Sequence, residues 1–374
     1  MYDLQEYLEP INLAFLNNDE AYNKKQIGSV IGASGDQMAD VEVADIVFVG
    51  ISENRGGGLA PSADAANAIR SQLYKLFYWH EDVKLADVGN IETGATVADS
   101  YAAIKTVVTE LLKMGKTVVL FGGSHDNTLA QYNCYKELKK VVEATVIDSM
   151  IDLNQDAPLK SESFLMDMLT TEPNYIRHYS HIGFQSYFVN PVILESMDKL
   201  RFDCFRVGMA KEKIEEMEPV IRNSNMVSID INAIKYSDAP ANQHSPNGFT
   251  GEEACILARF AGMSSQMDTL GIYGYRSDRD VNELTALQIA QMIWYFIDGK
   301  SRSKQEASFD DRHNFNEFYI SFTEAETTFL QSKRTGRWWL QLPDTKFIPC
   351  SYNDYVTASN NQIPERWLRA QERE

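Results

Sequence analysis

Short apolar runs alternate along the chain with stretches in which apolar residues recur at helical spacing. The runs are rich in valine, isoleucine and leucine, which is typical of strands buried on both faces of a sheet. Strands are therefore expected at 45–50, 117–123, 144–148, 181–184, 205–209, 225–230 and 269–274. Helices are expected at 64–79, 127–140, 211–222, 252–261 and 283–297. This alternation predicts an α/β protein with three α-β-α layers around a mostly parallel sheet.

The pattern changes at about residue 300. The polar, charged segment 300–314 is typical of a linker or mobile loop, whereas FNEFYISF, ETTFLQSK and GRWWLQL have the character of antiparallel strands. The remaining tail predicts a loop and a short helix. We therefore expect an α/β domain over 1–300 and a small β-rich appendage over 301–374. The appendage is expected to pack on the main domain or on a second subunit, and it is a candidate surface for a protein partner.

Composition and charge exclude several classes of function. The chain has 374 residues and a formal net charge of −18. Such an acidic chain repels phosphate backbones, so nucleic acid is not expected as a partner. No apolar run is long enough to cross a membrane, and the N-terminal segment lacks the basic and apolar regions of a secretion signal. The four cysteines are far apart and form no CxxC pair, which favours reduced thiols and a cytoplasmic location.

Three polar clusters directly follow predicted strands. They are GGSHDN (122–127), DSMIDLN (148–154) and SIDINAI (228–234). Any one of them alone is typical of a turn or a helix cap. Ligands of parallel sheets bind beyond the carboxyl ends of the strands, so the polar side chains of all three clusters are expected at one edge.

The order of these clusters resembles the ureohydrolase superfamily, which includes arginases, agmatinases and formimidoylglutamases. GGSHD, DSMIDLN and SIDINAIKYSDAP are similar to the metal-binding motifs of these enzymes. RGGGLAPSADAANAIRSQL, LADVGNI and NGFTGEEA are similar to further family segments, so the resemblance covers roughly residues 40–300. The stretch from SDAP to PNGFTGEEA is most similar to formimidoylglutamases. The resemblance implies an arginase-like fold and a homo-oligomer.

The resemblance also implies a metal site. Enzymes of this superfamily hold two Mn²⁺ ions and a bridging hydroxide that attacks the carbon of an amidine or guanidine. His125 and Asp152 match the two ligands private to the first ion, and Asp148 and Asp230 match the two bridging carboxylates. One imidazole with three carboxylates is a complete ligand set for a single hard cation.

The second ion of the family lacks its private ligands in this chain. Met150 and Asn232 stand where the family has a histidine and an aspartate. A thioether is too soft for Mn²⁺, and a neutral amide is a weaker ligand than a carboxylate. The predicted cofactor is therefore one Mn²⁺ ion or none.

Several functions are compatible with such a site. In the first, the chain is a formimidoylglutamase-like hydrolase of linear amidine C–N bonds, in which Asp152 or His125 positions the attacking water. By the resemblance, Asn154 and Glu253 would then face the substrate. In the second, the chain is an inactive pseudoenzyme that serves as a scaffold. In the third, it is a sensor that binds a small amidine or guanidine compound in the former active site.

Two other features of the sequence leave their role open. Arg276 and Arg279 lie in a charged loop after the predicted strand 269–274 and are candidates for binding a substrate carboxylate. A loop of solvated salt bridges is the simpler interpretation. His80, His244 and His313 have no polar partners in the sequence, and no role is predicted for them.

Overall fold

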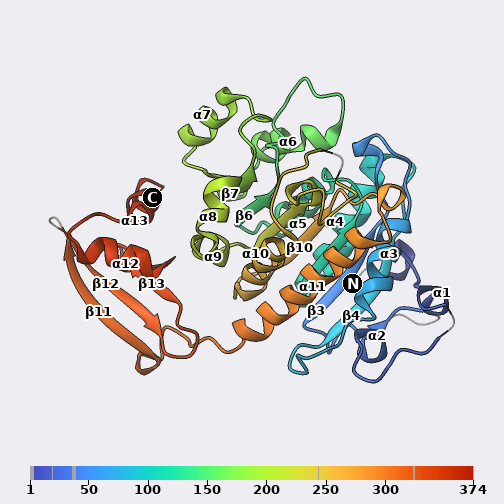
Figure 1. Cartoon of the computed structure of the whole chain (residues 1–374), viewed down its shortest axis with the longest axis horizontal. Coiled ribbons are helices and arrows are strands. Elements are labelled where there is room, and N and C mark those ends of the chain that lie inside the picture. The colour runs from blue at the N-terminus through green and yellow to red at the C-terminus, as the bar shows by residue number, and fades with distance from the viewer. Residues whose placement is uncertain (1–3, 19, 36–38, 243, 323–324, 374) are drawn as a thin grey trace.

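The computed structural model describes residues 4–18, 20–35, 39–242, 244–322 and 325–373. A large α/β body occupies most of the chain, and a smaller part with its own sheet lies to one side of it (Figure 1). The connection between the two parts follows α11 (Leu284–Ser303), the long helix that crosses the body (Figure 1).

A ten-stranded sheet forms the middle layer of the body, in the order β1-β4-β3-β5-β10-β9-β6-β7-β8, with β2 paired to β4. Every pairing is parallel except that of β1 with β4. The strands are β1 (Leu8–Glu9), β2 (Gly32–Ala33), β3 (Ile46–Ile51), β4 (Leu85–Ile91), β5 (Thr117–Gly122), β6 (Val142–Ile147), β7 (Ile176–Phe184), β8 (Asp203–Arg206), β9 (Met226–Asp230) and β10 (Thr269–Tyr273). The predicted three-layer fold with a mostly parallel sheet is thereby confirmed.

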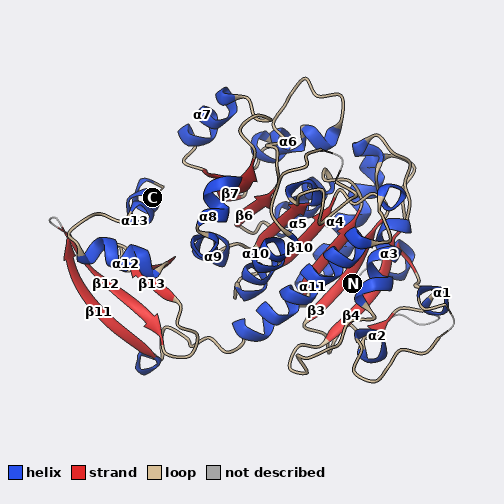
Figure 2. Ribbon diagram, in the orientation of Figure 1, coloured by secondary structure: helices blue, strands red, loops and turns tan. Residues whose placement is uncertain are grey.

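Helices cover both faces of this sheet (Figure 2). The two faces are seen in β3, where Ile46 and Phe48 join one buried cluster and Val47 and Val49 join another. The helices of the body are α1 (Leu13–Leu16), α2 (Ile27–Val30), α3 (Asp64–Leu73), α4 (Val97–Lys113), α5 (Asn127–Leu138), α6 (Phe164–Thr170), α7 (Pro191–Lys199), α8 (Val207–Glu212), α9 (Met217–Arg222), α10 (Gly251–Met263) and α11. The clusters assign α3, α10 and α11 to the first face and α4 to the second.

A buried network joins α3 to β4 and links two of the segments that carry the family resemblance. Arg70 is fully buried, and its Nε and Nη2 donate to the two carboxylate oxygens of Asp87 at 2.9 and 3.0 Å. Arg70 also donates to the carbonyl of Gly89 at 2.8 Å, and the Tyr74 hydroxyl donates to Asp87 at 2.9 Å. The arginine of the AIRSQL segment and the aspartate of LADVGNI are thus two halves of one ion pair.

The C-terminal part is a four-stranded antiparallel sheet backed by helices. Its elements are β11 (Phe315–Phe322), β12 (Ala325–Ser332), β13 (Trp338–Gln341), β14 (Phe347–Cys350), α12 (Tyr352–Ser359) and α13 (Glu365–Glu372). It packs on the body through Arg222 of α9, which donates to the carbonyl of Trp338 at 2.6 Å and lies over the Trp339 ring. At its other end, Arg369 of α13 pairs with Asp203 at 3.0 Å.

Some sequence-based expectations for elements were wrong. The strand expected at 205–209 ends at Arg206, and α8 begins at Val207. The segment 300–314 is not wholly a linker, because α11 continues to Ser303. The apolar pattern did not predict β4 or α4. The division at residue 300, the homo-oligomer, the protein partner and the cytoplasmic location stay predictions.

Two further observations concern the cysteines and the length of the helices. All four cysteines are free. No helix within the described ranges is both long and apolar enough to cross a membrane.

Candidate metal centre

The candidate ligands come from three strand ends at one edge of the central sheet. His125 lies in the turn between β5 and α5, Asp148 directly follows β6, and Asp230 is the last residue of β9. β10 separates β5 from β9, and Gly274 after β10 has a φ of +79°. A Cβ at Gly274 would lie 2.6 Å from Asp230 Oδ1, so this glycine allows β10 to pass close to the cluster.

The His125 ring is surrounded by carboxylates. Its Nδ1 lies 3.0 Å from Asp152 Oδ2 and 3.5 Å from the Oδ2 atoms of both Asp148 and Asp230. One ligand atom each from His125, Asp148 and Asp230 lies within 4.8 Å of the others. All four side chains are buried. One imidazole and three carboxylates are ligand types that Mn²⁺ accepts, so the residues present fit a single cation.

Neighbouring polar groups fix the orientation of two of these residues. His125 Nε2 lies 3.1 Å from the Ser228 hydroxyl, which lies 2.6 Å from Thr128 Oγ1. His181 Nε2 donates to the carbonyl of Asp148 at 3.1 Å. Hydrogen bonds of this kind set the tautomer and the direction of a ligating ring, and they leave His125 Nδ1 to face the carboxylates.

The charges of the cluster shift the pKa of every member. Burial lowers the pKa of His125, but hydrogen bonds to Asp148 and Asp152 and the charge of Asp230 raise it well above its usual value. Burial and the charge of Asp148 raise the pKa of Asp152 to about 8 and that of Asp230 to about 7. Burial also favours the neutral form of Asp148, yet His125 holds its pKa below the usual value. Without a cation, the cluster therefore retains protons at neutral pH.

This proton retention predicts how the stability of the cation-free protein depends on pH. The folded-state pKa values of Asp152, Asp230 and His125 are raised, so the native state binds more protons than the unfolded state up to about pH 8. The free energy of unfolding should fall as the pH rises from about 6 to about 8, by up to about 1.4 kcal/mol per unit for each proton retained.

Urea unfolding of the chelator-treated protein at both pH values measures this effect. Added Mn²⁺ should reverse the loss, because the cation replaces the protons. The Asp152→Asn variant, which cannot titrate at this position, should show a shallower dependence. A free energy that rises with pH in the absence of cation would contradict the charge arrangement described above.

Met150 and Asn232 stand where the family has two further metal ligands, and neither supplies a carboxylate or an imidazole. Asn232 donates its backbone N–H to Asp230 Oδ1 at 2.7 Å. The Met150 sulfur lies 2.9 Å from His244 Nε2, so a histidine from a distant loop reaches the place where the family ligand would stand. No role was predicted for His244, and no local sequence signal could have revealed this contact, because it spans 94 residues.

The two predicted substrate-facing residues lie outside the cluster and have local partners. Asn154 is exposed, and its side-chain oxygen accepts from the Asp156 N–H at 3.2 Å. Glu253 forms the capping box of α10 with Thr250 and pairs with Lys211 at 3.1 Å. The Thr-x-x-Glu spacing is itself the sequence signal for such a cap. Their substrate-facing role stays a prediction.

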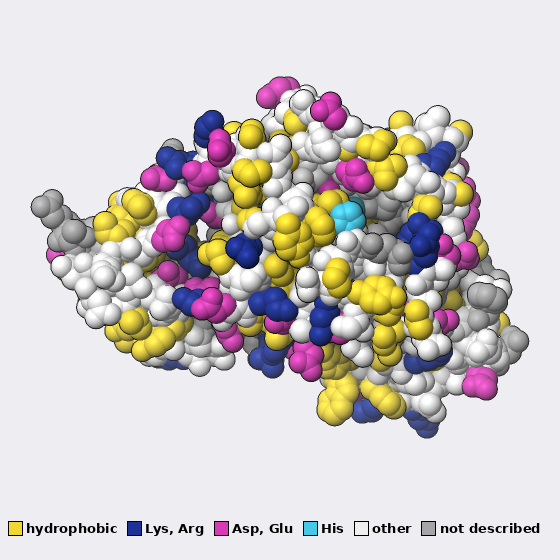
Figure 3. Space-filling model, turned by 45° about the horizontal axis from the view of Figure 1, so that its top comes forward, with side chains coloured by type: hydrophobic (Ala, Val, Ile, Leu, Met, Phe, Trp, Pro, Cys, Tyr) yellow, Lys and Arg dark blue, Asp and Glu magenta, His cyan; other side chains and the backbone are white. Residues whose placement is uncertain are grey.

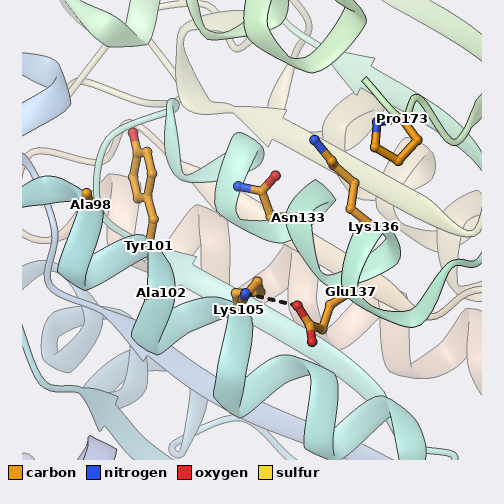
Figure 4. Close-up of a pocket in the computed structure, with 8 residues that line it drawn as sticks. All are labelled: Ala98, Tyr101, Ala102, Lys105, Asn133, Lys136, Glu137 and Pro173. Atoms are coloured by element: carbon orange, nitrogen blue, oxygen red, sulfur yellow. Dashed lines mark hydrogen bonds and ion pairs between the residues drawn. The ribbon is translucent and has the colours of Figure 1, made fainter. Parts of the chain in front are cut away.

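A surface cavity of about 450 Å³ lies away from the cluster, over α4 and α5 (Figure 4). Lys105 and Glu137 face each other across it at 3.0 Å, and Lys136 lies at its rim (Figure 4). The Tyr101 side chain, which also lines it, donates its hydroxyl proton to Asp126, the residue after His125. None of the four candidate ligands lines this cavity, so it is not the space in front of them.

Taken together, the fold and the cluster define an α/β protein with a candidate cation site of one imidazole and three carboxylates at the carboxyl edge of its sheet. Residues 44–298 match the arginase family, and the chain belongs to that family.

Individual relatives agree with this assignment. A formimidoylglutamase of Staphylococcus haemolyticus is 20% identical over 310 residues, which are 78% of this chain and 92% of the relative. The crystal structure of Trypanosoma cruzi formiminoglutamase with Mn²⁺ is similar at a TM-score of 0.64 and 18% identity, covering 70% of this chain and 95% of that one. The Bacillus subtilis formimidoylglutamase is similar at a TM-score of 0.65 and 16% identity, covering 75% and 94%. These structures establish the likeness in fold.

Proposed function

We propose that this protein is a divalent-cation-dependent hydrolase of C–N bonds in linear amidines, similar to formimidoylglutamases. The observation that carries the proposal is the buried convergence of Asp148, Asp152 and Asp230 on Nδ1 of His125, within 3.0 to 3.5 Å. Three buried carboxylates repel one another unless a cation or protons neutralise them. The membership of the arginase family and the likeness to formimidoylglutamases favour a cation.

Each residue of the cluster has a defined part in the proposal. Asp148, Asp152 and Asp230 would supply the negative charge that holds Mn²⁺, and His125 would present Nδ1 to it, because Ser228 orients the ring. A bound Mn²⁺ would supply Lewis acidity and activate a water for attack on the amidine carbon. Asp152, whose Oδ2 lies 3.0 Å from His125 Nδ1, would reach the same cation and position that water. Asn154 and Glu253 would contact the substrate only after exchanging their present partners.

The ligand set supports one ion per chain rather than two. Mass spectrometry of metal content, after incubation with excess Mn²⁺ and desalting, tests this number. We expect one equivalent that is lost in His125→Ala. Two equivalents would contradict the interpretation of Met150 and Asn232. No bound cation would contradict the proposal and would favour the scaffold or sensor alternatives.

The same interpretation predicts a gain of binding. The double substitution Met150→His and Asn232→Asp supplies an imidazole and a carboxylate where the family has them, and it should raise the Mn²⁺ content from one to two equivalents. The matched control is Met166→His with Asn133→Asp, two changes of the same chemistry outside the cluster, which should leave one equivalent. If the Mn²⁺ content of the double variant were unchanged, the absence of a second ion would have causes other than these two ligands.

A further inference from the structure

An aromatic and thioether rim lies beside the candidate metal centre. His244 Nε2 contacts the Met150 sulfur at 2.9 Å, and Met150 lies two residues after Asp148. The His244 ring packs edge-on against Phe188 at 5.2 Å, and Phe188 packs against Tyr187 at 4.7 Å. Phe188 is 38% exposed and Tyr187 is 66% exposed. We call Met150, Tyr187, Phe188 and His244 the aromatic rim.

Hydrogen bonds hold the loops of the aromatic rim to the loop of Asp148. The Gln185 N–H donates to the carbonyl of Ser149 at 2.8 Å, and Gln185 Oε1 accepts from the Ser245 hydroxyl at 3.0 Å. Asn242 is fully buried, and its side-chain oxygen accepts from the His244 N–H at 2.8 Å. These hydrogen bonds connect the loops after β6, β7 and β9. They therefore hold the residues of the aromatic rim in place.

Five basic residues in the loops around the cluster have acidic partners, whereas Arg206, exposed at the end of the edge strand β8, has no acidic partner among the described residues. Loops after β3, β5, β6, β7, β9 and β10 contain these Lys and Arg residues: Arg55, Lys160, Lys235, Arg276 and Arg279. Each of them pairs with a carboxylate from its own neighbourhood, namely Glu53, Asp167, Asp238 or, for the last two, Asp278. Figure 3 likewise shows positive and negative side chains interspersed over the visible face. The loop of Arg276 and Arg279 is thus a loop of salt bridges.

We infer that the aromatic rim binds the far end of the substrate and selects linear amidines whose far end is apolar. The inference rests on the proposed function and concerns the same site. Aromatic faces and a thioether favour apolar groups and cations. A dicarboxylate end, such as that of a glutamate derivative, would lie against the rim unpaired unless Arg206 reached it.

The proposal is tested by comparing the formamidines of 2-phenylethylamine, butylamine and glutamate as substrates of the Mn²⁺-supplemented full-length protein. We expect kcat/KM for the first two to exceed that for the glutamate derivative by at least about 10-fold. Phe188→Ala should lower kcat/KM for the phenylethyl compound by about 10-fold or more and leave the Mn²⁺ content unchanged. Tyr319→Ala, which removes a more exposed aromatic side chain in the C-terminal sheet, should have no effect.

Two results would overturn the inference. One is a preference for the glutamate derivative, above all if Arg206→Ala abolishes it, because Arg206 ends the edge strand β8 and would then bind the carboxylates. The other is an equal effect of Phe188→Ala on all three compounds.

If no compound is hydrolysed, the proposed function fails and calorimetry decides the inference separately. Benzamidine should bind the Mn²⁺-loaded protein more weakly in Phe188→Ala than in the native chain. An absence of benzamidine binding to the native chain would overturn the aromatic rim as a binding site as well.

Discussion

The Asp148→Asn substitution is expected to remove the cation from this protein. Asp148 is the only carboxylate of the cluster whose pKa lies below its usual value, so it carries a full negative charge when no cation is bound. Its Oδ1 accepts the Ser149 N–H at 2.5 Å, and its Oδ2 faces His125. The residues that merely orient metal ligands contribute about 10- to 100-fold to affinity, so the loss of a charged ligand should weaken Mn²⁺ binding by more than about 100-fold.

Titration with Mn²⁺ followed by electron paramagnetic resonance measures this affinity. Asp126→Asn is the matched control, because Asp126 is equally buried and directly follows His125, yet its carboxylate binds Tyr101 and lies against Gly56. The control should keep one equivalent of cation. Native affinity in Asp148→Asn would place the cation somewhere other than this edge of the sheet.

The second large effect is expected on the stability of the fold, at the buried ion pair of Arg70 and Asp87. Arg70→Met should lower the free energy of unfolding by about 3–5 kcal/mol, because it leaves Asp87 charged, fully buried and without its partner. Adding Asp87→Leu should recover most of the loss, since it removes the uncompensated charge.

Urea unfolding followed by circular dichroism separates these cases. Arg369→Met is a control in which a half-exposed arginine loses its partners, and it should cost less than about 1 kcal/mol. If the single and double variants of the buried pair were equally unstable, the loss would come from packing around α3 and not from the charge of Asp87.

The apolar runs of the sequence predicted the strands whose side chains are buried on both faces, because an unbroken apolar run identifies such a strand without knowledge of its neighbours. β4 was not predicted, because its run of apolar residues is interrupted by polar ones. Its sequence LADVGNI contains Asp87 and Asn90, whose partner Arg70 lies on a helix 17 and 20 residues away. Without the contact to Arg70, the polar residues of this segment are typical of a turn.

Some residues of the candidate site could likewise be predicted from the sequence, and others could not. Its clusters stand at strand ends, so the sequence could predict that His125, Asp148 and Asp230 meet at one edge. The contact of His244 with Met150 could not be predicted, since the loop after β9 is irregular and only the fold brings it back over the loop after β6. Glu253 illustrates a competing signal, because the family resemblance suggested a substrate contact and the capping box gave the same carboxylate a local partner.

The place of β10 in the sheet has a consequence for how the protein is made. β10 is the last of the ten strands to be synthesised, yet it lies at the centre, pairing Ile272 with Phe121 of β5 and Tyr273 with Asp230 of β9. Until it leaves the ribosome, the native strand pairs that can form are those within β1-β4-β3-β5 and within β9-β6-β7-β8, and no native strand pairing yet connects the part with His125 to the part with Asp230. The open edges of these two sets of strands invite non-native pairing. The candidate ligands can therefore gather only in one late event, when the last strand inserts between the two halves.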